Sequence, residues 1–392
     1  MSLTTPQLLL IAPIIGGIGL SLISRWRRAS AVIGTLFVIA LILAMRISEN
    51  EVLLVLERPF TLTDENYTLF TLMLAGMGLL FALSVWIPTK QAFAPLAIAA
   101  ITPLAAAVMV QPLTYAPLFL LLAFAALTPI AQTNGYANNA PTRYLLLGVL
   151  AVPALLLVDW MGTQSLPTFS MTIVWLMLLT TAVLSAAFPF IGWVRPLVRE
   201  MEGLTAVYLF SVAQLGITAV LFTFLHEQAW LLDESTFIAG LRWGGSITAL
   251  LGGLTAIAPK SSSEKPSPKH MLGSLLLINM GVMAWAFTLP AGLGWETAVS
   301  IHTGRFIGLL LAGIGLHLMT TSRLQKLAMG LFAYGGFTLL GLPLTAGFIG
   351  QWKVLMVTEA TWPLFIILLG IGTAVYGFSR HLYGTEWFTL EE

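Results

Sequence analysis

The stretch GLPLTAGFIGQWKVL, residues 341–355, decides the fold, because it interrupts an apolar segment with a proline, glycines, a glutamine and a lysine. The stretch AAFPFIGWVRPL, residues 186–197, repeats part of it, since PFIGW is similar to GFIGQW. Proline removes a backbone donor and glycine permits irregular backbone, so both segments can unwind within a membrane helix. We therefore predict two broken helices, whose elements are Pro189, Gly192, Pro343, Gly347 and Gly350. The alternative is two kinked helices in which the glycines serve packing alone.

The composition is that of an integral membrane protein. Of the 392 residues, 58% are hydrophobic and 9% are charged, and the mean hydropathy is +0.91, whereas a soluble domain carries roughly 25% charged residues. No cysteine is present, so disulfides and thiolate metal sites are excluded. The N-terminus lacks a basic region before its first apolar run, so we interpret that run as a spanning helix and not as a cleaved signal.

Thirteen stretches are apolar enough over about 17–25 residues to be read as spans. They lie near residues 8–23, 31–45, 67–86, 92–110, 114–131, 144–158, 171–193, 204–225, 237–258, 271–288, 305–321, 327–350 and 362–378. With this count, the loops on one side hold thirteen of the 18 Lys and Arg residues. The other side holds only Arg46, Arg58, Arg242, Arg305 and Lys353. Because basic loops stay cytoplasmic, we expect the N-terminus outside and the C-terminus in the cytoplasm.

Four stretches carry a resemblance to a known family. They are RYLLLGVLAVPALLL at residues 143–157, AAFPFIGW at 186–193, KHMLGSLLLINMG at 269–281 and LLGLPLTAGFIGQW at 339–352. In this order, and at the sixth, seventh, tenth and twelfth spans, they resemble the antiporter-like subunits of respiratory complex I, of Mrp-type cation/proton antiporters and of membrane-bound hydrogenases. The resemblance covers roughly residues 110–380.

The resemblance implies an all-α polytopic membrane protein with about 13 transmembrane helices and two inverted repeats, in which helices 7 and 12 are broken. Phe190 and Phe348 occupy equivalent places 158 residues apart, and recurring discontinuous helices mark a transporter fold. We expect residues 1–110 to form helices 1–4, residues 111–225 to complete the first repeat with helices 5–8, and residues 226–392 to form the second repeat with helices 9–13. No fourteenth helix is expected.

In the family, the proton path uses a glutamate on helix 5, lysines on helices 7 and 8, a Lys or His on helix 10 and a Lys or Glu on helix 12. Transferred by their flanking motifs, these positions hold Phe124, Leu184, Gln214, Asn279 and Gln351. All five are neutral, and amides neither gain nor lose a proton near neutral pH. The resemblance therefore implies a degenerate proton path.

The charged residues agree with this interpretation. We place none of the 35 in the central third of a span, where each would cost about 3 kcal/mol. Two plausible titratable groups within the membrane remain, His317 on helix 11 and Lys353 at the outer end of helix 12. They define a residual polar path. Alternatively, His317 is a packing residue and Lys353 extends to the interface.

Our hypothesis is a membrane subunit of a complex-I-like NAD(P)H:quinone oxidoreductase or a related energy-converting complex, which has lost autonomous proton translocation and acts structurally. Two alternatives stay open: an active proton or cation translocator that uses a water wire, and an independent solute carrier. The sequence shows no Gly-rich phosphate loop, metal-ligand spacing or catalytic triad, so we expect no cofactor and no catalysis in this chain. The expected partners are other hydrophobic subunits and lipids, not nucleic acid, in a bacterial plasma membrane or a thylakoid.

Overall fold

The computed structural model describes residues 4–132, 139–164, 170–257, 267–321, 324–357 and 361–384. The chain folds into two compact units. The first unit comprises Met1–Thr180 and Leu204–Gln228, and the second comprises Thr181–Gly203 and Ala229–Glu392. Each unit is built almost entirely of apolar helices, so the all-α polytopic fold that we predicted is confirmed.

The first unit contains seven complete helices and most of an eighth, α8, whose last residues belong to the second unit. These are α1 (Thr5–Ile23), α2 (Arg27–Ile47), α3 (Asp64–Ser84), α4 (Phe93–Ala99), α5 (Ile101–Met109), α6 (Ala116–Ala131), α7 (Ala140–Thr163) and α8 (Ser170–Leu184). A 3-10 turn, Leu113–Tyr115, precedes α6. Later in the chain, α10 (Gly203–Val207), a π-helical segment (Tyr208–Ala213) and α11 (Gln214–Glu227) form one continuous helix of this unit. A short antiparallel hairpin of β1 (Leu53–Val55) and β2 (Arg58–Phe60) joins α2 to α3.

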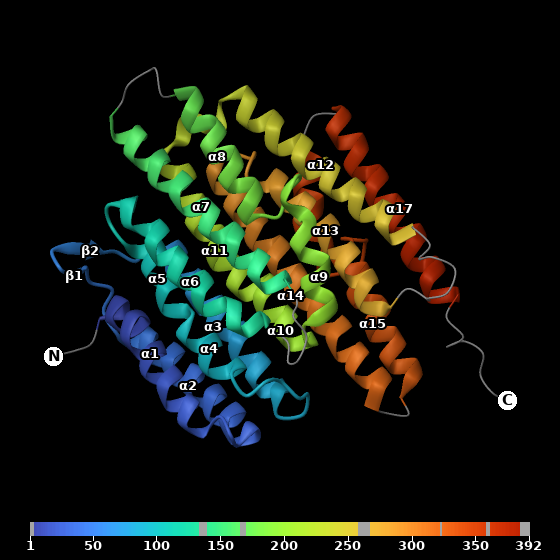
Figure 1. The fold of residues 1–392 in the computed structure, drawn as a ribbon, viewed down its shortest axis with the longest axis horizontal. Coiled ribbons are helices and arrows are strands. Elements are labelled where there is room, and N and C mark those ends of the chain that lie inside the picture. The colour runs from blue at the N-terminus through green and yellow to red at the C-terminus, as the bar shows by residue number, and fades with distance from the viewer. Residues whose placement is uncertain are drawn as a thin grey trace. The chain divides into compact units, whose positions relative to one another are not determined.

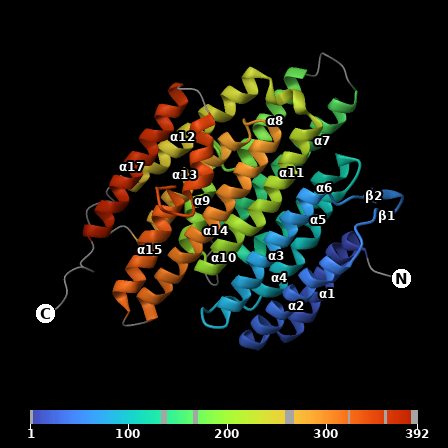
Figure 2. The same cartoon turned by 180° about the vertical axis from the view of Figure 1, so that it is seen from behind.

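The second unit begins at the end of α8. Its helices are α9 (Val194–Glu200), α12 (Ser235–Ile257), α13 (Pro268–Ala286), α14 (Ala291–Thr321), α15 (Gln325–Leu339), α16 (Phe348–Val357) and α17 (Trp362–Gly384). Two 3-10 turns, Phe190–Trp193 and Ala229–Leu232, precede α9 and α12. Figures 1 and 2 show α12 beside α17 and α14 beside α15, and these pairs make extensive contacts.

Local sequence explains where these helices begin. Thr63 caps α3 by accepting a hydrogen bond from Asn66 N–H, 3.3 Å away, and Asp64 and Glu65 in the first turn favour the positive end of the helix dipole. Ser267 caps α13 in the same way, accepting from His270 N–H at 3.3 Å, with proline at the first helical position.

All thirteen predicted spans coincide with helical segments. Within the described residues, nine helices are long and apolar enough to cross a membrane, and shorter apolar helices cover Phe93–Met109, Ser170–Leu184 and Phe348–Val357. One predicted boundary was wrong: the eleventh span starts at Ala291, not at Arg305. The C-terminal residues 385–392 and part of the polar loop at 260–270 lie outside the described residues.

Each unit is organised around a buried helix. In the first unit the apolar window of Gly203–Glu227 is entirely buried. In the second, every residue from Met271 to Ala286 is buried. Small residues allow the backbones to approach closely: a Cβ on Gly245 of α12 would lie 2.5 Å from the carbonyl oxygen of Gly281 on α13. Close packing on glycine is typical of membrane helices, where association depends on van der Waals contact.

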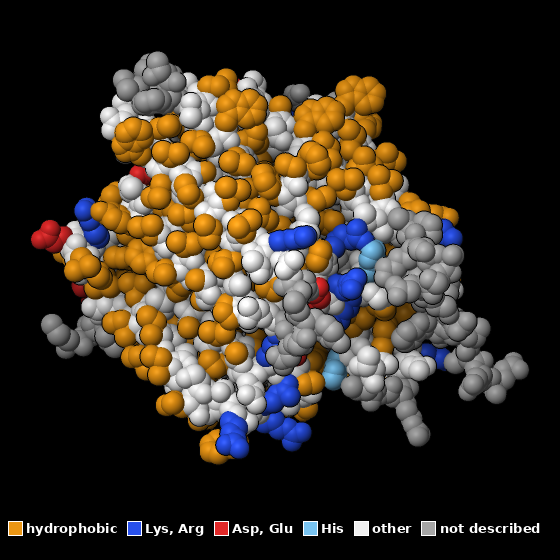
Figure 3. All heavy atoms as spheres, in the orientation of Figure 1, with side chains coloured by type: hydrophobic (Ala, Val, Ile, Leu, Met, Phe, Trp, Pro, Cys, Tyr) orange, Lys and Arg blue, Asp and Glu red, His pale blue; other side chains and the backbone are white. Residues whose placement is uncertain are grey.

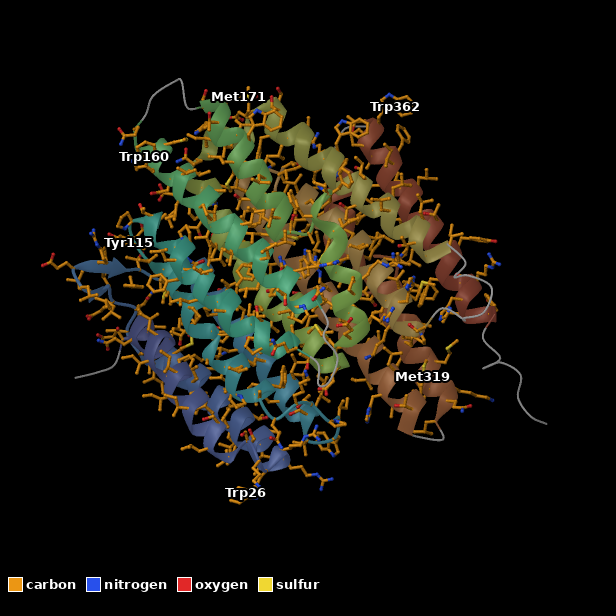
Figure 4. The ribbon with its side chains drawn as sticks, in the orientation of Figure 1. Trp26, Tyr115, Trp160, Met171, Met319 and Trp362 are labelled. Carbon is orange, nitrogen blue, oxygen red and sulfur yellow. The ribbon has the colours of Figure 1, made fainter. Side chains whose placement is uncertain are left out.

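The outer faces are apolar, as a lipid environment requires. Hydrophobic side chains cover most of the face in Figure 3. Large aromatic residues lie exposed at helix ends, among them Trp26 before α2, Trp160 near the end of α7 and Trp362 at the start of α17 (Figure 4). Exposed tryptophans at helix ends are typical of the interface between lipid and water.

Candidate functional site

The first predicted helix break is present between α8 and the 3-10 turn at Phe190. After Leu184 the chain leaves the helix, and Ala186 adopts a positive φ of 56°. The Ala187 N–H donates to the Ala182 carbonyl oxygen at 2.8 Å, which makes this a Schellman motif. Pro189 follows in the five-residue break, joined to Phe188 by a cis peptide bond. Gly192 faces open space, since a Cβ there would meet no heavy atom within 4 Å.

The second predicted break, between α15 and α16, repeats this design. Gly341 takes the place of Ala186 with φ 65°, and Leu342 N–H donates to the Phe337 carbonyl oxygen at 3.2 Å. Helices α8 and α15 end at Leu184 and Leu339, 155 residues apart, and the helical segments after the breaks begin at Phe190 and Phe348, 158 residues apart. The second break is therefore three residues longer than the first. Its additional residues include Leu344, with φ 69°. The prediction that helices 7 and 12 are broken is confirmed.

Two glycines fix the position of α16. A Cβ on Gly347 would lie 1.9 Å from the carbonyl oxygen of Thr338, and one on Gly350 would lie 2.6 Å from the backbone nitrogen of Ile301 on α14. Neither position tolerates a side chain without a shift of backbone. Pro343, by contrast, is exposed. The glycines of this break therefore bring α16 against the end of α15 and the middle of α14.

This approach gathers the polar side chains of the second unit around one carbonyl group. Helix α15 ends at Leu339, whose carbonyl oxygen, like others in a last helical turn, has no partner within the helix. Gln351 Nε2 donates to it at 2.8 Å and Asn279 Nδ2 at 3.3 Å. Both amides are at least 98% buried. Two of the predicted site residues thus meet at the helix break, where they satisfy freed backbone.

Arg305 completes this cluster, and the sequence analysis missed it. Its Nε donates to Asn279 Oδ1 at 2.6 Å, and the side chain is 1% exposed. Arg305 is the fifteenth of the 31 residues of α14, about 21 Å from the first residue of the helix and about 24 Å from the last. The expectation that no charged residue lies in the central third of a span is therefore wrong. His302, 2% exposed, lies one turn earlier on the same helix.

The remaining candidates of the second unit lie away from this cluster. His317 is twelve residues beyond Arg305 on α14, about 18 Å along the helix, and is half-buried. Lys353 Nζ lies 3.5 Å from Glu296 Oε2, and the two side chains are 39% and 68% exposed. Such an exposed pair agrees with the interpretation of Lys353 as an interfacial residue. Leu184 is the buried last residue of α8.

In the first unit, the candidate positions are buried in apolar surroundings. The Phe124 ring on α6 lies 5.0 Å from the ring of Tyr144, measured between centroids. It also covers Gly148, where a Cβ would lie 2.4 Å from the ring. Gln214, 4% exposed, directly follows the π-helical segment. Irregular helical turns of this kind are frequent at functional sites. The structure thus shows a packed aromatic ring at Phe124, the position to which the sequence resemblance assigns the glutamate of helix 5.

The chemistry of the second-unit cluster follows from its groups. Asparagine and glutamine do not exchange protons near neutral pH, and arginine stays protonated in proteins. A cation at about 4 Å from the guanidinium would meet a repulsion of about 4 kcal/mol at an effective dielectric constant of 20. The two amides and the guanidinium can hold a fixed positive charge, and none of the three exchanges a proton near neutral pH. Among the described residues, no group of three or more His, Asp or Glu could hold a metal ion.

No protein-family model matches the chain. Among solved structures, it is similar to a chain of the membrane-bound sulfane sulfur reductase (MBS), an archaeal respiratory membrane complex, with a TM-score of 0.78 and 13% identity over 99% of this chain and 89% of that one. It is also similar to a chain of the Mrp complex from Dietzia sp. DQ12-45-1b, with a TM-score of 0.76 and 16% identity over 97% of this chain and 47% of that one. A chain of respiratory complex I from Thermus thermophilus with bound NADH is similar with a TM-score of 0.73 and 18% identity, over 97% of this chain and 88% of that one. The antiporter-like fold implied by the sequence motifs is thereby confirmed.

Proposed function

We propose that this chain, which shares its fold with chains of three membrane complexes, is itself a membrane subunit of a complex-I-like NAD(P)H:quinone oxidoreductase or a related energy-converting complex. In this proposal it has lost autonomous proton translocation and contributes structurally. The similarity to chains of MBS, of an Mrp complex and of complex I supports membership in such an assembly. Its partners are then other hydrophobic subunits and lipids.

The observation that carries the loss of translocation is the bond between Arg305 and Asn279. A proton path needs groups at depth that bind and release protons. At the helix break of the second unit, the side chains that hydrogen-bond around the Leu339 carbonyl oxygen are instead two amides, which donate to it, and a guanidinium bonded to one of them. The fixed charge opposes the approach of any cation, and the amides offer no site where a proton can rest.

Contacts at one end of the second unit support the proposed orientation. Arg195 on α9 and His270 on α13 belong to two segments that we expect on the cytoplasmic side, and their side chains are in hydrogen-bond contact. In the same region Lys269 Nζ donates to the Met201 carbonyl oxygen at 2.8 Å. The clustering of these basic side chains favours the cytoplasmic side for this end of the second unit. The outer N-terminus, the cytoplasmic C-terminus and the location in a bacterial plasma membrane or a thylakoid remain part of the proposal.

The proposal is tested in the intact complex, in inverted membrane vesicles that pump protons. We expect Gln214→Leu and Gln351→Leu to leave the pumping rate within about twofold of the wild type when the amount of assembled complex is matched. Deletion of the whole chain should instead lower the amount of complex. A strong loss of pumping in either variant, with the complex fully assembled, would show that these amides belong to a working path and would overturn the proposal.

A further inference from the structure

The break between α15 and α16 lies at the depth of the hydrocarbon core. Helix α15 starts at the exposed Gln325 and Lys326, and its 15 residues extend about 22 Å. Helix α16 adds 10 residues, or about 15 Å, beyond the break. Because the hydrocarbon core is about 30 Å thick, the eight residues between these helices cannot lie in water on either side of the membrane.

The backbone of this break is exposed and incompletely satisfied. The Leu344 side chain is 96% exposed, and its N–H has no hydrogen-bond partner among the described residues. Only its carbonyl oxygen has a partner, the Tyr334 hydroxyl at 3.2 Å. At the other break the exposed Phe188 is protected, because its N–H donates to Thr248 Oγ1 at 2.7 Å. The two breaks therefore differ: the first is satisfied within the unit and the second is not.

Lipid and water are both poor neighbours for this surface. Irregular backbone exposed to lipid does not occur within the hydrocarbon region, because each unsatisfied polar group costs several kcal/mol. A water-filled cavity is disfavoured by the side chains around it. Ile349, Trp352 and Met356 follow Leu344 along one side of α16 and are 62%, 44% and 66% exposed. Trp352 stacks on Phe348 with ring centroids 5.3 Å apart, which fixes its position.

The geometry points to a docking surface for a transmembrane helix of a neighbouring subunit, formed by Leu344, Ile349, Trp352 and Met356, here named the α16 ridge. The partner helix buries the apolar ridge and supplies an acceptor oxygen to the Leu344 N–H. Fixed tryptophans are enriched among the residues that carry binding energy in interfaces. The inference rests on the proposed function, since it assigns the surface through which the chain enters its complex.

Single cysteines test this, because the chain contains none of its own. Leu344→Cys, labelled with a benzophenone maleimide in native membranes and irradiated, should give one adduct whose cross-linked peptide is an apolar stretch of about 20 residues from another polypeptide. The matched control is Leu36→Cys at the middle of α2, which is 60% exposed in the wild type. We expect at least fivefold less protein adduct there. Adding Ile349→Trp, which enlarges the ridge, should lower the Leu344→Cys adduct about tenfold.

Three results would overturn the inference: adducts with lipid alone at position 344, an adduct with a second copy of this chain, or rapid modification of that cysteine by a membrane-impermeant maleimide. The last would show an aqueous cavity. Since Leu344 is almost fully exposed, its replacement leaves folding intact, which size-exclusion chromatography checks. If protons are pumped through the chain but the adduct still forms, the proposed function is refuted and the docking surface stands. If no adduct forms and no protons are pumped through the chain, the docking surface is refuted and the proposed function stands.

Discussion

The bond between Arg305 and Asn279 makes a quantitative prediction. Asn279→Leu removes the acceptor of Arg305 Nε and the donor to the Leu339 carbonyl oxygen, at 2.6 Å and 3.3 Å. A hydrogen bond to a charged group contributes about 1.5–3 kcal/mol and a neutral one about 0.5–1.5 kcal/mol. We therefore expect Asn279→Leu to lower the free energy of unfolding of the second unit by roughly 2–4 kcal/mol. At about 2–4 °C per kcal/mol, the melting midpoint falls by roughly 4–16 °C.

A double-mutant cycle isolates the charged hydrogen bond. When Arg305→Met is combined with Asn279→Leu, both polar partners become apolar, and such replacements are often close to neutral. The double variant should be more stable than the sum of the single effects predicts, by about 1.5–3 kcal/mol.

Thermal unfolding in detergent, followed by fluorescence of the 12 tryptophans, measures these midpoints. The control is Thr303→Val on α14, an exposed residue whose hydroxyl bonds only to its own helix, at Val299 O. It should shift the midpoint by less than about 1 °C. Single effects that add within about 0.5 kcal/mol would refute the contact.

Three further variants test the helix breaks and one helix end. Gly347→Ala places a Cβ 1.9 Å from the Thr338 carbonyl oxygen, so it should abolish the monodisperse peak in size-exclusion chromatography, whereas Gly372→Ala, with no heavy atom within 4 Å, should leave it unchanged. Ala186→Gly relieves a positive φ of 56° and should raise the free energy of unfolding by about 1 kcal/mol, as seen in the melting midpoint. Burial lowers the pKa of Lys269 below 10.5. At pH values between that lowered pKa and 10.5, the Lys269 side chain binds more protons in the unfolded state than in the folded state. The stability of the wild type relative to Lys269→Met should therefore rise with pH, as measured by melting midpoints from about pH 8 to 10.5.

The sequence allowed the helices and their breaks to be predicted, because both have local causes. Long apolar runs mark the spans, and the proline and glycines at 343, 347 and 350 mark the second break. The hairpin was missed because its turn carries no local signal. Leu56 and Glu57 adopt φ values of 49° and 64°, as in a type I′ turn, where asparagine and glycine are the usual residues.

The cluster around Arg305 depends on tertiary packing and so was not predicted. Hydropathy places the start of the eleventh span at Arg305, because the preceding residues are mixed in polarity. The helix nevertheless begins at Ala291, and it packs against the second break, since a Cβ on Gly304 would lie 2.6 Å from Cα of Gly347, the residue before α16. Asn279 was singled out as a neutral replacement, but its two hydrogen bonds could be assigned only once the end of α15 was placed.

The account depends on the absence of a proton path through this chain, and proton flux measures that directly. The chain of 392 residues is reconstituted in liposomes loaded with a pH-sensitive dye, and a potassium gradient with valinomycin imposes an inward driving force. We expect the rate of internal acidification to equal that of protein-free liposomes, and Asn279→Leu to leave it unchanged. Acidification well above this leak that Asn279→Leu or Gln214→Leu abolishes would contradict the account.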